Sequence, residues 1–68
     1  MATYKMITVV GTSPTSYADA TEKAVQDAAK TVRHLGWFEV KEMRGRIAEG
    51  RVAEYQVKIE AGFRVEGD

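Results

Sequence analysis

The 68-residue sequence contains no cysteine, and it has only one histidine, one proline and one tryptophan. Without cysteine there are no disulfides and no thiolate metal sites, and a single histidine, His34, excludes a histidine-rich metal cluster. A domain of this size buries only about 60% of the surface that its unfolded chain exposes, so it usually needs a further source of stability. Association with other copies of the chain is the source that remains.

An excess of charge of one sign and long apolar runs are also missing. Ten basic and ten acidic residues give a formal net charge of zero, which argues against a general binder of nucleic acids. Hydrophobic residues make up 44% of the chain, which argues against disorder. No apolar run approaches the ~20 residues of a membrane span, and the first residues lack the pattern of a signal peptide. We therefore expect a cytoplasmic protein that binds neither nucleic acid nor membranes.

Three segments have the composition or alternation of strands. Residues 4–10 are rich in β-branched side chains, and residues 37–47 and 51–65 predict two further strands joined by a turn at 48–50. In the last segment apolar odd-numbered residues alternate with mostly polar even-numbered ones, so one face of the strand is apolar. Gly62 predicts a bend or bulge in this strand.

A helix is expected over residues 16–35, between the first two strands. Ser16 is a good N-cap with Asp19 three residues later, and small apolar residues recur at helical spacing as far as Leu35. Arg33 and His34 would then occupy the last turn, and Gly36 would be the residue that ends the helix.

These elements predict one domain over residues 1–68, of the α+β class. Their order is βαββ, with a three-stranded antiparallel sheet wrapped around one helix. One face of the sheet would then have no covering layer within the chain, although domains normally consist of packed layers.

The uncovered sheet face carries an unusual pair of side chains. If the apolar face of the last strand packs on the helix, Trp37 and Gln56 both point away from it. Tryptophan offers a flat surface for stacking, and a glutamine amide can donate and accept at the edge of a planar heterocycle. Arginines 44, 46 and 64 lie on or near the same hairpin, and arginine suits phosphate. Together these residues fit a site for a flavin nucleotide.

Each of these features also has a simpler interpretation. A lone tryptophan on an exposed face is more often an oligomer contact, a strand glutamine is usually solvated, and surface arginines usually pair with nearby glutamates. The "GTSPTS" segment lacks the glycine spacing and lysine of a phosphate loop, which favours a plain turn and helix cap. No catalytic set of residues emerges. The residues alone indicate a small oligomeric βαββ protein with a candidate site for a planar ligand.

Three segments in order, "VVGTSPTS" (9–16), "TVRHLGWFEVKEMRG" (31–45) and "EYQVKIEAGFRVE" (54–66), resemble the dodecin family. The resemblance covers nearly the whole chain. It implies βαββ protomers in a hollow spherical homododecamer that binds flavins in pairs, between tryptophans of symmetry-related subunits. It also implies flavin storage or sequestration, with photoprotection, and no catalysis.

The resemblance implies roles for six residues. By position, Trp37 matches the stacking tryptophan and Gln56 the glutamine at the ring edge. Arg44 and Arg64 match positions near phosphate groups, which favours flavin mononucleotide (FMN), with riboflavin or FAD as the alternatives. Some bacterial members also hold coenzyme A, and Tyr4 and Arg33 match positions near these ligands. Gly36 departs from the pattern, because many bacterial members carry an acidic residue before the tryptophan.

Two other functions compete with flavin storage. One is a structural cage or scaffold without a dedicated ligand, in which Trp37 only packs between subunits. The other is a flavin-dependent enzyme, which is the weakest hypothesis because no base or nucleophile stands beside the expected ring. Flavin binding by the purified protein distinguishes flavin storage from the structural cage.

Overall fold

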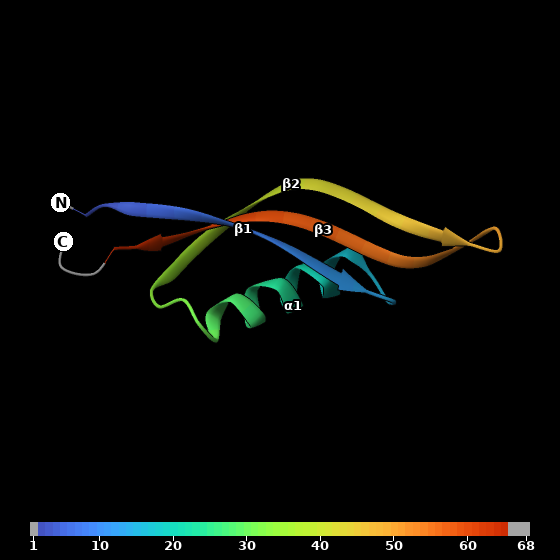
Figure 1. Ribbon diagram of the computed structural model, residues 1–68, viewed down its shortest axis with the longest axis horizontal. Coiled ribbons are helices and arrows are strands. Elements are labelled where there is room, and N and C mark those ends of the chain that lie inside the picture. The colour runs from blue at the N-terminus through green and yellow to red at the C-terminus, as the bar shows by residue number, and fades with distance from the viewer. Residues whose placement is uncertain (1, 66–68) are drawn as a thin grey trace.

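The computed structural model of the chain describes residues 2–65 and has the order βαββ (Figure 1). The elements are β1 (Tyr4–Ser13), α1 (Tyr17–Ala29), β2 (Leu35–Ala48) and β3 (Arg51–Arg64). The strands form one sheet in the order β1-β3-β2, and both pairings are antiparallel. The predicted α+β class and the three-stranded antiparallel sheet are confirmed. β1 continues three residues beyond its expected end, to Ser13, and β2 is three residues longer than expected, whereas β3 ends one residue early, at Arg64.

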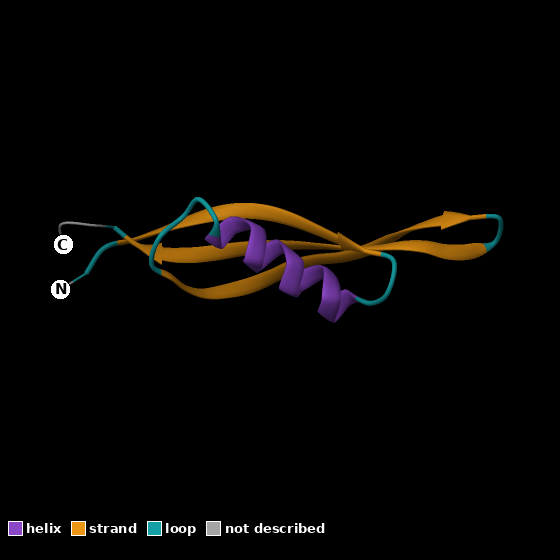
Figure 2. Cartoon of the chain, turned by 90° about the horizontal axis from the view of Figure 1, so that it is seen from below, coloured by secondary structure: helices purple, strands orange, loops and turns teal. Residues whose placement is uncertain are grey.

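The helix crosses one face of the sheet obliquely (Figure 2) and packs mainly against β1 and β3. The core consists of Ala20, Ala24 and Ala28 of α1 against Val57, Ile59 and Ala61 of β3, all of them buried. Small side chains on the helix allow its close approach to the sheet, as the sequence pattern predicts. They also make the core small.

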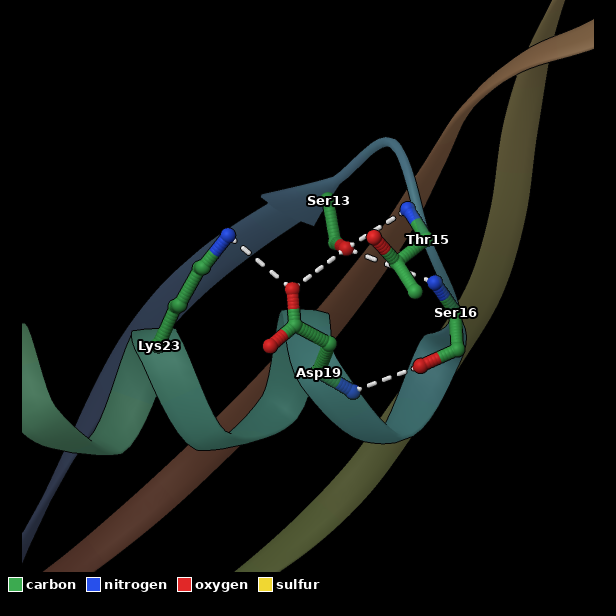
Figure 3. Close-up of polar contacts among 5 residues, drawn as sticks. All are labelled: Ser13, Thr15, Ser16, Asp19 and Lys23. Carbon is green, nitrogen blue, oxygen red and sulfur yellow. Dashed lines mark hydrogen bonds and ion pairs between the residues drawn. The ribbon is translucent and has the colours of Figure 1, made fainter.

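A hydrogen-bond network fixes the connection between β1 and α1 (Figure 3). The Ser16 hydroxyl accepts from the Asp19 backbone N–H at 3.0 Å, which confirms Ser16 as the N-cap. The Asp19 carboxylate does not reach back to Ser16, as it would in a capping box. It accepts instead from the buried Ser13 hydroxyl at 2.6 Å, and Ser13 Oγ in turn accepts from the backbone N–H groups of Thr15 and Ser16. Ser13 therefore completes the cap from the end of the preceding strand.

The helix ends six residues earlier than expected, at Ala29 with Lys30 as C-cap. Thr31 and Val32 follow, and their β-branched side chains lower helix propensity. His34 has a φ of 66° and turns the chain back toward the sheet. The expected helix end at residue 35 was therefore wrong, as was the placing of Arg33 and His34 in its last turn; Gly36 lies within β2. No helix in the described part of the chain is long and apolar enough to cross a membrane.

The β2–β3 hairpin extends beyond the helix and gives the molecule its elongated shape, 51 × 20 × 13 Å (Figure 1). Its turn consists of two residues, Glu49 and Gly50, with φ values of 53° and 72°. Positive φ at both central positions is the pattern of a type I′ turn, whose twist matches that of the flanking strands. Glycine adopts this conformation without strain, whereas glutamate does so only rarely.

Candidate ligand-binding site

The face of the sheet opposite α1, called the open face below, carries most of the predicted site residues. Trp37 lies opposite Gly62, Arg44 lies opposite Gln56, and Tyr4 lies opposite Arg64. Directly opposed residues of antiparallel strands share a face, and the odd-numbered residues of β3 face the helix. The register therefore puts all of these residues on the open face. The alternation in the sequence predicts the same face for Trp37 and Gln56.

At one end of the open face, Trp37 is held by two contacts, one with the sheet backbone and one with an aromatic ring. Its rings lie against the β3 backbone at Gly62, and the Tyr4 ring meets it edge to face at a centroid distance of 5.1 Å and an interplanar angle of 69°. The side chain is nevertheless 43% exposed. A large aromatic surface is thus held in place and still accessible to a stacking partner.

In the middle of the open face, Gln56 belongs to a chain of polar contacts. Its Oε1 accepts from Arg44 Nε at 2.8 Å, and its Nε2 donates to Glu54 Oε1 at 2.8 Å. Arg44 also pairs with Glu42 at 2.9 Å, and Arg46 lies 4.0 Å from Glu54. An amide has two donors and two acceptor lone pairs, so these contacts orient Gln56 and leave one donor and one lone pair for a ligand.

A β-bulge brings Arg44 to the same face as Trp37. Strict alternation from Trp37 would send Arg44 to the helix side, but the register shifts between Val40 and Glu42 and leaves Lys41 as an extra residue. A signal for this shift is present in the sequence, because the apolar positions of β2 change from even numbers to the odd number of Met43. A second register shift lies between Leu35 and Trp37, opposite Phe63 and Gly62. The bulge expected near Gly62 is therefore on β2 and not on β3.

The site residues form two separate groups within one chain. Gly62, beneath Trp37, and Gln56 are six residues apart on β3, which at ~3.3 Å per residue is roughly 20 Å. A three-ring heterocycle stacked on Trp37 does not reach Gln56 of the same chain. Alternation in the sequence assigns residues to a face of the sheet but not to positions along the paired strands, so it does not predict this separation.

Arg33 lies on neither part of the open face. Together with Lys5 and Arg64 it lines a cavity of about 520 Å³ near the ends of β1 and β3, where Thr31 and Phe63 contribute further walls. All the charged side chains among the described lining residues are cationic. The chemistry of this cavity suits a phosphate or another anion.

Acidic side chains occupy the sheet between the two groups. Glu39 lies opposite Glu60, whose carboxylate accepts from the Thr8 hydroxyl at 2.7 Å. Lys41 lies 3.7 Å from Glu39, so part of this negative charge is balanced locally. Within residues 2–65 there is no group of three or more histidine, cysteine, aspartate or glutamate side chains that could hold a metal ion.

The sequence matches the family model described as Dodecin over residues 3–66. A dodecin from Thermus thermophilus is 54% identical over 63 residues, which are 93% of this chain and 91% of the relative. Calcium dodecin from Mycobacterium tuberculosis is 34% identical over 65 residues, which are 96% of this chain and 92% of the relative.

Solved structures agree with these matches. A Thermus thermophilus protein superimposes with a TM-score of 0.95 at 50% identity, with all of both chains covered. Three variants of the dodecin from that organism superimpose with TM-scores of 0.92 to 0.95 at 48 to 50% identity, covering at least 97% of this chain and 98% of theirs. One replaces a tryptophan by phenylalanine, and two replace an arginine by alanine. The spacing between their three substituted positions equals that between Trp37, Arg44 and Arg64 of this chain.

Proposed function

The chain belongs to the dodecin family, and we propose on that basis that it stores and sequesters flavin, with FMN stacked on Trp37. The observation that carries the proposal is the state of the Trp37 side chain. Its indole lies on a sheet face that α1 does not cover, is held by Gly62 and Tyr4, and remains 43% exposed. A flat, ordered and accessible indole is what a stacked isoalloxazine ring requires.

Gln56 would read the edge of the ring from a different copy of the chain. The separation of roughly 20 Å between Gln56 and Gly62 excludes contact of both Trp37 and Gln56 with one ring inside a single chain. A ligand that contacts both therefore has to lie between copies. This requirement agrees with the hollow homododecamer that membership of the family implies.

Arginine side chains favour a phosphorylated flavin over riboflavin. Arg44 lies beside Gln56 and keeps guanidinium N–H groups beyond those bonded to Gln56 and Glu42. The Trp37, Arg44 and Arg64 spacing shared with the three variants of the relative supports their assignment as functional positions. We therefore place FMN before riboflavin and FAD.

A second ligand, coenzyme A, is favoured by the cationic cavity. Lys5, Arg33 and Arg64 line this cavity together, and cationic side chains suit a ligand with several phosphate groups. The cavity includes neither Trp37 nor Gln56, so it does not overlap the flavin stack, but it shares Arg64 with the residues proposed to favour the FMN phosphate.

Titration of FMN with the purified protein tests the main proposal. We expect flavin emission to fall along a saturable curve, with riboflavin binding more weakly than FMN. An assembled protein that changes neither the emission nor the absorption of FMN would favour a cage without a dedicated ligand. Calorimetric titration with coenzyme A, in the presence and absence of FMN, tests the cationic cavity separately.

The remaining functional assignments rest on the sequence and the family resemblance. We propose a binding protein and not an enzyme, formed by a single domain over residues 1–68, that acts in the cytoplasm without nucleic acid or membrane partners. The mycobacterial relative is named for calcium, but we do not propose calcium binding for this chain, because within residues 2–65 no three or more acidic or other ligating side chains are grouped to hold the ion.

A further inference from the structure

The approach of Trp37 to the sheet depends on the absence of a side chain at position 62. A Cβ atom added to Gly62 would lie 2.5 Å from Cε2 and Cη2 of Trp37 and still closer to Cζ2. Carbon atoms in contact are separated by about 3.5–4.0 Å, so any side chain at position 62 would displace the indole. Glycine here gives the six-membered part of the indole a flat backbone surface to lie on.

Tyr4 limits the orientation of the same indole from a second direction. Its ring meets that of Trp37 edge to face, at 5.1 Å between centroids and 69° between planes. Such arrangements are favoured because the positive edge of one ring meets the negative face of the other. The three strands thus contribute one residue each, since Tyr4 lies on β1, Gly62 on β3 and Trp37 on β2.

We propose that Gly62 and Tyr4 are positioning residues that fix the plane of the Trp37 indole before a ligand arrives. The inference rests on the proposed function for the identity of the ligand, a planar heterocycle stacked on the indole. It gives Tyr4 a different role from the ligand contact implied by the family resemblance. An indole that is already ordered loses less side-chain freedom on binding, which strengthens the affinity for the stacked ring.

The ligand-free protein provides the first test, because Trp37 is the only tryptophan and its signals need no deconvolution. The variants are Gly62→Ala, Tyr4→Leu and Tyr4→Phe. We expect the first two to lose the tryptophan bands of the near-ultraviolet circular dichroism spectrum and to lower the emission anisotropy. Tyr4→Phe keeps the ring edge and is expected to behave like the parent.

Two control variants separate positioning from general destabilisation. Gly36→Ala adds the same methyl group next to Trp37, but beyond the two chain neighbours the nearest atom to its Cβ is the Gly62 carbonyl oxygen at 4.0 Å. Tyr17→Leu removes a comparable edge-to-face pair, Tyr17–Tyr55 at 4.9 Å and 77°. Both are expected to retain the tryptophan signature. Far-ultraviolet circular dichroism and size measurements verify folding, and if Gly62→Ala fails to fold, the two Tyr4 variants decide.

Titration with FMN is the second test. We expect Gly62→Ala and Tyr4→Leu to bind FMN about threefold to tenfold more weakly, the cost of ordering one side chain on binding. An unchanged ligand-free signature in both variants, or unchanged affinity despite a lost signature, overturns the proposal. Weaker binding by Tyr4→Phe with an intact signature overturns it for Tyr4, because the hydroxyl would then act on the ligand. If the parent itself does not bind FMN, the proposed function fails, while the ligand-free signals still decide whether the two residues order the indole.

Discussion

At the scale of single residues, the amide of Gln56 is oriented before any ligand binds. Arg44 donates to its oxygen and Glu54 accepts from its nitrogen, both at 2.8 Å. These contacts also fix which end of the amide is the acceptor, which a solvated glutamine would leave undefined. The polar edge of the candidate site is thus organised by neighbours on the same sheet face.

We expect Gln56→Ala to weaken FMN binding by roughly threefold to tenfold while the assembly stays intact, because one neutral hydrogen bond contributes about 0.5–1.5 kcal/mol. Fluorescence titration measures the affinity, and light scattering measures the assembly. Gln26→Ala, at an exposed position of α1, is the matched control. Parent-like affinity in a normally assembled Gln56→Ala protein would exclude Gln56 as the reader of the ring edge.

Substitutions of Trp37 are expected to separate binding from quenching. Trp37→Ala should lose both the stacking surface and the quencher, and bind FMN roughly tenfold more weakly or worse. Trp37→Phe keeps a flat ring and part of the affinity, but should lose most of the rapid quenching, because phenylalanine is much harder to oxidise by excited flavin. Time-resolved flavin emission measures the quenching. A Trp37→Phe protein that quenches as fully as the parent would remove the mechanism of photoprotection.

The two groups of site residues differ in how far the sequence predicts them. The position of Trp37 on the open face follows from alternation over only three residues, from Trp37 to Phe38 and Val40. The position of Arg44 does not, because the extra residue at Lys41 inverts the alternation. Bulges depend on pairing with β3, a contact with a distant part of the chain that local patterns describe only indirectly.

At the scale of elements, the start of α1 can be predicted from the local sequence, whereas its end cannot. Its start is a local feature, fixed by Ser16 and by Ser13 three residues earlier, and it was predicted correctly. Its end was predicted wrongly, because apolar spacing continues to Leu35 in the sequence. In the structure Leu35 pairs with Phe63 as the first residue of β2, so strand pairing with β3 outweighs the helical pattern.

The network at the start of α1 predicts a pH dependence of stability. The hydrogen bond from the Ser13 hydroxyl, followed by the contact with Lys23 at 2.9 Å, lowers the pKa of Asp19 below its ordinary value of 3.8. A lowered pKa in the folded state means that the stabilising contribution is present above the ordinary pKa and is lost as the pH falls through the folded pKa. The protein should therefore lose this contribution only in strongly acidic solution.

We expect Asp19→Asn to lower the unfolding midpoint at neutral pH and to flatten its decline below pH 3.8. Thermal unfolding at a series of pH values and one fixed protein concentration measures both effects. Asp27→Asn removes another carboxylate of α1, which pairs with exposed Lys30 at 3.1 Å, and serves as the control. An Asp19→Asn protein with the acid sensitivity of the parent would show that the network does not couple protonation to folding.

The hairpin turn offers a stabilising substitution. Glu49 has a φ of 53°, a left-handed conformation that costs most residues about 1–2 kcal/mol and asparagine less. Glu49→Asn is therefore expected to stabilise the protein by up to about 1 kcal/mol, since Asn-Gly is a favoured pair in two-residue hairpins. Thermal unfolding measures the gain, with Glu49→Ala as the control. An unfolding midpoint of Glu49→Asn no higher than that of Glu49→Ala would contradict the expected gain from asparagine at this turn position.

At the scale of the whole molecule, one chain buries too little apolar surface for its size. Among the described residues, four of the six buried apolar side chains are alanine, and nine large hydrophobic side chains are exposed. Three of these, Phe38, Val40 and Met43, line a groove of about 530 Å³ between α1 and β2, on the helix side of the sheet. Such contiguous exposed apolar surface marks an interaction site.

We therefore expect the protein to be an obligate oligomer without a stable folded monomer at micromolar concentration. Phe38→Glu puts a charge into the groove between α1 and β2, where burial of an unpaired charge is costly, and should dissociate and destabilise the assembly together. Gln26→Glu makes the same change in net charge at an exposed position of α1 outside the groove and should leave the assembly intact. Sedimentation velocity measures the distribution of species, and circular dichroism shows whether dissociated chains remain folded. A folded monomer in the parent, or a Phe38→Glu protein that assembles like Gln26→Glu, would mean that the small core is sufficient and that the apolar groove does not hold the copies together.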